Sequence, residues 1–303
     1  MKYAEIASKF LDYYWSQYYV FKLWQGPRNQ PAKIGKIMNK HFDDEHRLMR
    51  LDEVRRNHPE IVSKCENQIR KMCMHDVIPR FENELSAKKK YFYEFHAVKE
   101  YDDPAHNKMI NPDAGILINS SARDFLRRNY APLLRAVIFH WTKFLERFNP
   151  TTPRLASKAE GKIEGSRNQA KFRKVLEDGK VRCFYCDCKI KQKSVHVDHV
   201  IPFNYIADTQ LWNLVLACSG CNCKKSDRLP PKECLDALIE RNRTRSEHKE
   251  YRDSLCLLGD WEKDIVMHYN NAGSQGFNTL EEFGCGKEKA AKQVLQPCED
   301  EDA

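Results

Sequence analysis

The sequence lacks an uninterrupted apolar stretch long enough to cross a bilayer. A membrane-spanning helix takes about 20 consecutive, mostly apolar residues, whereas charged residues break every apolar run here within a few positions. The first residues also lack the apolar segment of a secretory signal peptide, because Glu5, Lys9 and Asp12 fall where that segment would lie. We therefore expect a cytoplasmic protein with no membrane span.

Internal repeats and the composition of a disordered chain are absent as well. Hydrophobic residues make up 41% and charged residues 31% of the 303 residues. This balance is ordinary for a folded protein and excludes disorder throughout the chain. The length is sufficient for one large core or two moderate ones.

An excess of negative charge is also missing. The 51 Lys and Arg residues outnumber the 43 Asp and Glu residues, so the formal net charge is +8. Between residues 154 and 228 there are fifteen Lys or Arg and eight Asp or Glu, which places +7 of that charge in one quarter of the chain. A local basic excess favours a polyanionic partner, although a solvated basic face explains the charge equally well.

Hydrophobic periodicity predicts a mostly helical chain up to about residue 150. The first predicted helix, 3–24, has aromatic side chains around too much of its circumference for one packing stripe, and we interpret it as buried on several sides. A second long helix, 122–148, is predicted to bury one face. The apolar side chains of that face are Phe125, Leu126, Tyr130, Leu133, Leu134, Val137, Ile138, Trp141, Phe144, Leu145 and Phe148. The remaining elements predicted in this half are helices at 31–42 and 44–86 and a strand at 91–97.

The "NPTTP" segment at 149–153 ends the helical periodicity and predicts a domain boundary near residue 153. We expect a helical domain at 1–152, a small module at 153–230, and further helices with an acidic tail at 231–303. The last part is predicted to contain helices after Pro231 and near 247–270. The predicted fold class is therefore α+β.

Twelve cysteines are present, and six of them fall between Cys183 and Cys223. A cytoplasmic location argues against disulfides. Two Cys-x-x-Cys pairs stand out, "CFYC" at 183–186 and "CSGC" at 218–221. Each short turn directs two thiolates toward one point, and Zn²⁺ takes four ligands in a tetrahedron. We predict that Cys183, Cys186, Cys218 and Cys221 hold a structural zinc, with Cys188 and Cys223 as bystanders.

The segment between the pairs combines acidic and imidazole side chains on a predicted strand. "VHVDHVIPF" at 195–203 alternates apolar and polar residues like a strand, and Asp198 and His199 lie side by side in it. A zinc knuckle with a purely structural role does not require a carboxylate and an imidazole side by side. Hydrolysis of a phosphodiester requires a base that deprotonates water, a divalent cation and a group that holds the base in the right tautomer.

The segment from about 181 to 230 contains four motifs in this order: "CFYC", "VDHVIPF", "WNLVLAC" and "CSGCNCKK". In this order of motifs the segment resembles the HNH nucleases, which have a ββα-metal fold. The resemblance implies that His199 is the general base and that Asp198 and Asn222 bind a catalytic Mg²⁺ or Mn²⁺. It also implies that the Asn213 side chain bonds to backbone across the loop and so fixes the orientation of His199. These oxygen ligands suit a hard cation.

Several assignments stay open at this point. Asp198 alone could cap a turn, His199 could bond to a backbone carbonyl, and Asn213 could be a helix N-cap. His196, on the same strand face as Asp198, is interpreted as a structural or solvated histidine, with participation in the site as the alternative. Three basic residues after the second pair are predicted to contact phosphates, with a plain surface role as the alternative. These are Lys224, Lys225 and Arg228.

The predicted function is a metal-dependent HNH endonuclease that hydrolyses DNA and acts in bacterial or phage defence or restriction. An alternative is a zinc-dependent nucleic-acid-binding module without cleavage activity. A further possibility makes the chain the effector subunit of a larger complex, in which the helical domain binds a partner protein. One HNH site cuts one strand, so cutting both strands requires a homodimer or two successive events.

Overall fold

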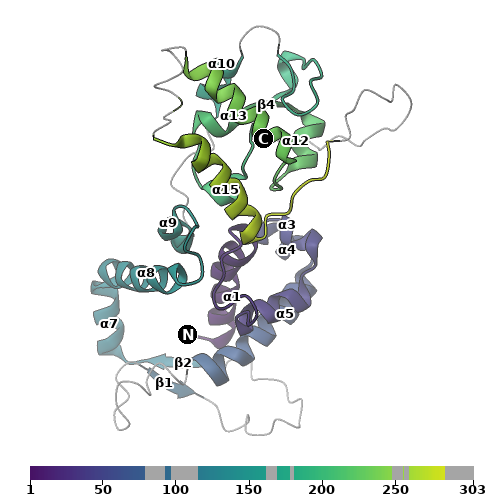
Figure 1. The fold of residues 1–303 in the computed structure, drawn as a ribbon. Helices are drawn as coiled ribbons and strands as arrows, with labels where there is room; N and C mark the ends of the chain where they lie inside the picture. The colour runs from purple at the N-terminus through teal and green to yellow at the C-terminus, as the bar shows by residue number, and fades with distance from the viewer. Residues whose placement is uncertain are drawn as a thin grey trace. The chain divides into compact units, whose positions relative to one another are not determined.

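The structure is a computed structural model, and it describes residues 1–78, 93–96, 115–161, 169–177, 181–247, 255 and 259–283. The chain divides into two compact units (Figure 1). Unit 1 comprises Met1–Pro150 and Leu155–Lys162, and unit 2 comprises Thr151–Arg154 and Ile163–Ala303. The α+β class is confirmed, because helices dominate and the strands form two small antiparallel sheets, β1–β2 and β3–β4. The three-part division predicted above stays a prediction.

Unit 1 is built mainly from helices. Its elements are α1 (Tyr3–Tyr14), η1 (Trp15–Val20), α2 (Lys33–His41), α3 (Asp44–Leu48), α4 (Leu51–Asn57), α5 (Pro59–Met72), η2 (Cys73–Val77), β1 (Tyr93–His96), β2 (Gly115–Ile118), α7 (Ser120–Arg128), α8 (Tyr130–Glu146) and α9 (Leu155–Glu160). The helix predicted at 44–86 is divided, and Pro59 occupies the first position of α5, where its missing N–H is tolerated. Residues 79–86 of that prediction lie outside the described residues.

The aromatic first helix is largely buried. The wider π-helical turn η1 continues α1 and carries Trp15 and Tyr19 into the core of unit 1. The Trp15 ring meets Tyr19 and Phe42 edge to face, with ring centroids 5.0 and 4.9 Å apart. Such pairs add to the stabilisation that comes from buried area alone. Tyr13 is exposed, so one side of the helix faces away from this core.

The continuous buried face predicted for 122–148 is wrong for much of its length. Asn129 ends α7 and α8 starts anew at Tyr130, so the predicted helix is divided. Tyr130 and Val137 are 64% and 65% exposed, whereas Leu145 near the end of α8 is fully buried. The periodicity identified a helix with an apolar face but carried no information on what covers that face.

Unit 2 contains the zinc and histidine motifs. Its elements are α10 (Ala170–Leu176), η3 (Gln192–Ser194), β3 (Val195–His199), α11 (Phe203–Ile206), η4 (Leu211–Asn213), β4 (Leu214–Cys218), α12 (Ser219–Lys225), α13 (Lys232–Ser246) and α15 (Trp261–Gln275). Residues of α13 and α15 share one apolar core with β3 and β4, including Leu235, Leu238 and Ile265. The flanking helices therefore enlarge a core that the short module could not supply by itself. The acidic tail lies outside the described residues.

The strands β3 and β4 pair antiparallel, and α12 follows β4 directly. The register places Asp198 opposite Val215 and His199 opposite Leu214. Neighbouring strand residues point to opposite faces, so Asp198 and His199 can serve one site only if the strand stops there. β3 does end at His199, and the chain bends at Val200.

No helix in the described part of the chain combines the length and the apolar character that a membrane crossing requires.

Candidate active site and zinc cluster

The four cysteines of the two Cys-x-x-Cys pairs converge. Cys183 and Cys186 belong to a tight turn, Cys218 ends β4, and Cys221 lies in the first turn of α12. All four sulfur atoms lie within 4.8 Å of one another, and the Sγ atoms of Cys186 and Cys218 are 3.9 Å apart. Sulfurs at about 2.3 Å from a central Zn²⁺ stand about 3.8 Å apart in a tetrahedron. The cluster therefore fits a structural zinc.

The surroundings of the cluster favour the thiolate form at one cysteine, Cys183, whereas burial raises the pKa of Cys218, and the hydrogen bond to Cys183 together with burial raises the pKa of Cys221. A hydrogen bond from the Cys221 thiol, together with bonds from backbone amides, lowers the pKa of Cys183 to about 4 despite its burial. Cys188 and Cys223 are exposed and lie outside the group of four. This agrees with the prediction that they are bystanders.

Asp198 lies in a buried pocket of hydrogen-bond donors. Its Oδ2 accepts a hydrogen bond from the Tyr185 hydroxyl at 2.6 Å and faces the Lys225 Nζ at 3.4 Å. Burial, and secondly the Asp198 charge, raise the pKa of Tyr185 well above its usual value. The phenol therefore stays protonated and donates. Within the described residues, Oδ1 of Asp198 makes no hydrogen bond or ion pair.

The structure corrects the placement of Lys225, which the sequence predicts as a surface contact to phosphate. The side chain is only 1% exposed, because Lys225 lies four residues after Cys221 on the inward face of α12. Burial lowers the pKa of Lys225, and the Asp198 charge opposes this shift. The ammonium group thus balances the charge of a predicted metal ligand.

His199 is buried at the end of β3. Its Nδ1 lies 3.2 Å from the side-chain amide nitrogen of Gln169, which immediately precedes α10. The Phe203 ring packs at 5.1 Å between centroids. The amide nitrogen and oxygen of a glutamine are interchangeable by a flip, and the imidazole tautomer decides which of them faces Nδ1.

Gln169 is the site residue that the sequence reasoning missed. It lies 30 positions before His199, and glutamine carries no motif of its own. The pattern of helix α10 after it, with Phe172, Val175 and Leu176 packed in the unit 2 core, is the only signal that this segment is anchored near the site.

Asn213 clamps the loop that follows His199. Its Nδ2 donates to the Ile201 carbonyl and its Oδ1 accepts from the Ile201 N–H, both at 2.8 Å. The Asn213 backbone carbonyl also accepts from Val200 N–H at 2.9 Å. The side chain is fully buried. An amide is the one side chain that offers both a donor and an acceptor in this arrangement.

Replacing Asn213 by alanine is expected to lower the free energy of unfolding by about 2–5 kcal/mol, because the buried Ile201 N–H and carbonyl both lose their partner. Asn213→Asp keeps the acceptor but not the donor. Its free energy of unfolding is expected to lie between those of the wild type and Asn213→Ala. Denaturant unfolding of the three proteins measures this. Equal stability of Asn213→Ala and wild type would contradict the clamp.

The other predicted residues are more exposed. Asn222 is half-buried on α12, Lys224 is exposed, and Arg228 is half-buried with its guanidinium donating to the Lys224 carbonyl. His196 is half-buried opposite Ala217. The structure thus brings together the four cysteines, and it brings together Asp198 with Lys225. It does not bring the Asn222 side chain into a hydrogen bond with any described residue.

Comparison with known proteins identifies a family for part of the chain. The family of HNH endonucleases matches residues 183–231. No curated protein and no solved structure matches the chain. The resemblance to the HNH endonucleases of the four-cysteine type is therefore confirmed for this part of unit 2. It supports a nuclease-type function and a nucleic-acid substrate.

Proposed function

We propose that the protein is a metal-dependent endonuclease that hydrolyses DNA phosphodiester bonds at the site around His199. The observation that carries the proposal is the position of this imidazole. It stands at the end of β3, beside a carboxylate, on a loop that Asn213 clamps, in a module that four cysteines hold together. Such rigidity is what a catalytic base requires, since it must keep its geometry as the reaction proceeds.

His199 is proposed to take the proton of the attacking water at Nε2. For this, Nδ1 must carry a proton and donate it to an acceptor, so the Gln169 amide must present its oxygen toward Nδ1. The hydrogen bond then holds one tautomer and one ring orientation, and it stabilises the imidazolium that forms during proton transfer. The Asn213 clamp fixes the backbone of the loop that follows His199.

The catalytic cation is proposed to bind at Asp198 and Asn222. The donor chemistry fits, because a carboxylate and an amide offer the oxygen ligands that Mg²⁺ or Mn²⁺ prefers, and Oδ1 of Asp198 is not engaged by a described residue. A bound divalent cation supplies Lewis-acid stabilisation of charge on the phosphate and the leaving oxygen. Tyr185 and Lys225 hold Oδ2 and so orient the carboxylate.

Variants of Gln169 test the tautomer assignment. Gln169→Glu keeps an acceptor at Nδ1 and is expected to retain the kcat of the wild type. Gln169→Lys offers only donors and is expected to lower kcat by about tenfold to a hundredfold with little change in KM, since a hydrogen bond to a group that becomes charged contributes about 1.5–3 kcal/mol. Cleavage kinetics measured up to saturating DNA separate the effect on kcat from the effect on KM. Equal losses in both variants would contradict the assignment.

The remaining parts of the proposal go beyond the family match at residues 183–231. We propose a role in bacterial or phage defence or restriction, in the cytoplasm, with residues 1–152 selecting the target or binding a partner protein. Lys224 and Arg228 are proposed as contacts to DNA phosphates, where their charges would strengthen binding at low salt. A homodimer is proposed only for the case in which the protein cuts both strands of DNA.

A second candidate is a zinc-dependent nucleic-acid-binding module that does not cleave. The observation in its favour is the Lys225 ammonium at 3.4 Å from Asp198, because this ion pair satisfies the carboxylate without any metal. The basic excess of residues 154–228 would then serve binding alone.

One experiment separates the two candidates. Zinc-loaded protein is incubated with supercoiled DNA, or with RNA, in Mg²⁺, Mn²⁺ or EDTA, and the ends produced are mapped. The endonuclease predicts nicked or linear DNA with Mg²⁺ or Mn²⁺ and intact DNA in EDTA. Retarded but uncut DNA under every condition would favour the binding module, whereas RNA cleavage alone would replace DNA as the substrate.

A further inference from the structure

One side of α8 is anchored in unit 1, where the helix lies beside α9 (Figure 1). The Trp141 Nε1 donates to the Oε1 of Gln17 at 3.0 Å, and Thr142 and Leu145 are buried. These positions define the inward side of the helix. Side chains on the opposite side of α8 point away from these contacts.

Basic side chains occupy that opposite side. His140, Lys143 and Arg147 follow the spacing of three and four residues that places side chains on one helix face, and all three are exposed. We call them the basic stripe. Residues 120–148, which include α7 and α8, contain six Lys or Arg and two Asp or Glu, so their formal charge is +4.

Little of this charge is balanced within the described part of the protein. Among the described residues, the six Lys and Arg side chains form one ion pair, between Arg123 and Asp124 at 3.3 Å. Both side chains are exposed, and an exposed ion pair contributes little. Lys143 and Arg147 therefore present their charge to solvent.

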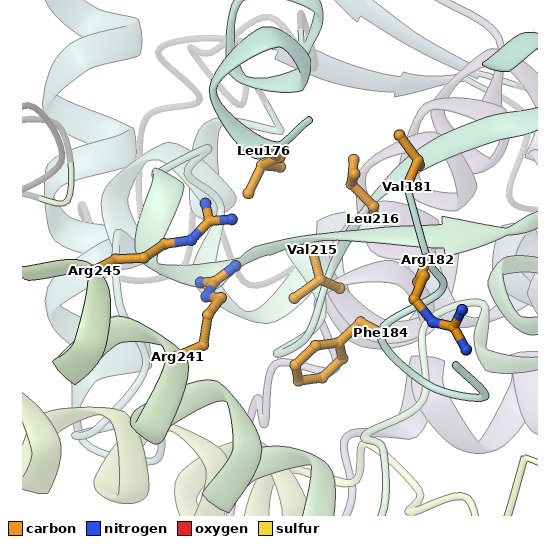
Figure 2. Close-up of a pocket in the computed structure, with 8 residues that line it drawn as sticks. All are labelled: Leu176, Val181, Arg182, Phe184, Val215, Leu216, Arg241 and Arg245. Carbon is orange, nitrogen blue, oxygen red and sulfur yellow. The ribbon is translucent and has the colours of Figure 1, made fainter. Parts of the chain in front are cut away.

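Two arginines in a cavity of unit 2 differ from these cations. Arg182 and Arg241 are among the residues that line this cavity of about 190 Å³ (Figure 2). Arg182 forms a bidentate pair with Asp187, with both distances 2.7 Å, and Arg241 donates to the Trp212 carbonyl at 2.9 Å. Both guanidinium groups are thus engaged within unit 2, whereas the basic stripe of α8 faces outward.

Aromatic rings flank the basic stripe. Phe139 is 56% exposed, and the Lys143 Nζ lies 5.1 Å from the centre of its ring. On the other side of the stripe Phe144 is exposed as well, and its ring stacks on that of Trp141 with centroids 5.2 Å apart. Exposed apolar groups that gather on one surface mark an interaction site. Rings combined with Lys and Arg are typical of surfaces that bind single-stranded nucleic acid.

The charge and the rings together identify the kind of partner. A second copy of the chain fits poorly, because two identical faces with positive charge repel each other. A polyanion matches the charge, and the HNH endonuclease family match at 183–231 of the same chain favours nucleic acid over other polyanions. The bases of a duplex already stack on one another, so a duplex would leave Phe139 in water. A single strand offers the faces of its bases to the rings.

We propose that the basic stripe of α8 binds a single-stranded stretch of nucleic acid, with phosphates against Lys143 and Arg147 and bases stacked on Phe139 and Phe144. The choice of nucleic acid rests on the proposed function, in which residues 1–152 select the target. Strand binding is measured without cleavage, so its outcome is separate from that of the nuclease proposal.

Fluorescence anisotropy of a labelled oligothymidylate strand measures the affinity of the zinc-loaded full chain in buffer without Mg²⁺ or Mn²⁺. A duplex of the same length and vesicles of phosphatidylserine are the comparison probes. Phe139→Ala tests the stacking, and Tyr13→Ala is its matched control, because Tyr13 of α1 is also an aromatic residue of unit 1 with 56% exposure. Phe139→Ala is expected to bind the single strand at least about fivefold more weakly than the wild type, and Tyr13→Ala is expected to bind it equally well. Both variants are expected to bind the duplex like the wild type.

A double variant tests the phosphate contacts. Lys143→Gln combined with Arg147→Gln is expected to weaken binding and to make it less dependent on salt. The slope of log affinity against log salt concentration falls by about 0.7 for each phosphate contact that is lost on a single strand. The control combines Lys36→Gln with Arg56→Gln, which removes two exposed cations from α2 and α4. It is expected to keep the slope of the wild type.

The proposal is overturned if Phe139→Ala and Tyr13→Ala bind the single strand alike, or if both double variants have the same salt dependence. Vesicle binding that depends on Phe139, without such a dependence for the strand, would assign the face to a membrane surface instead. A dimer that dissociates in Phe139→Ala, measured by sedimentation, would assign it to a second copy. A chain that binds the strand through Phe139 but cuts no nucleic acid supports this role of α8 and contradicts the nuclease, whereas cleavage without this dependence does the reverse.

Discussion

Replacing His199 by alanine is expected to lower the rate of DNA cleavage by about 10²–10⁴-fold, the usual contribution of a positioned general base. The variant loses the imidazole that is proposed to take the proton of water, while the Asn213 clamp and the four-cysteine cluster remain. KM and DNA affinity are therefore expected to stay close to those of the wild type. Single-turnover cleavage of supercoiled plasmid with Mg²⁺ measures the rate.

The control for this variant is His196→Ala. His196 lies three residues before His199 on the same strand, is half-buried, and is not assigned a catalytic role. It is expected to keep most of the activity, and both variants are expected to keep their zinc. An active His199→Ala protein would refute the assignment of the base. Loss of zinc or of the folded state in that variant would make the rate uninformative, so zinc content and thermal unfolding are measured alongside.

The sequence was most informative where the chemistry is local. Two Cys-x-x-Cys turns each fix the approach of two sulfurs within four residues, so only the meeting of the two turns depended on the fold. The Asn213 clamp followed from the resemblance and spans only twelve residues to Ile201. Short-range geometry of this kind is nearly independent of how the rest of the chain packs.

Long-range packing explains what the sequence did not reveal. Gln169 reaches His199 from the position just before α10, and nothing in a single glutamine marks such a contact. Lys225 appeared to be a surface residue because it is charged, although its spacing of four from Cys221 placed it on the buried face of α12. For α8 the apolar periodicity predicted the helix, but the exposure of Val137 depends on which elements cover it.

Removing the zinc is expected to unfold the HNH part of unit 2. Binding of a structural zinc contributes about 10–16 kcal/mol to the folded state of small modules, which is comparable to the total stability of about 5–15 kcal/mol that a domain has. Cys221→Ser removes one buried ligand and is expected to lose zinc, the β3–β4 core and cleavage together. Zinc content and thermal unfolding, with and without a chelator, measure the effect.

Cys223→Ser is the matched control. Cys223 lies two residues further along α12, about 200° around the helix from Cys221, and is exposed. The Cys223 thiol could take the place of Cys221 only if α12 rotated about its own axis. This variant is therefore expected to keep its zinc and its melting temperature. Unit 1 has its own core around Trp15 and Met38, and a transition from that core is expected to persist in Cys221→Ser. If Cys221→Ser retained zinc and the unfolding temperature of Cys223→Ser, the four sulfurs would not form the clamp that holds His199 and Asp198 in place.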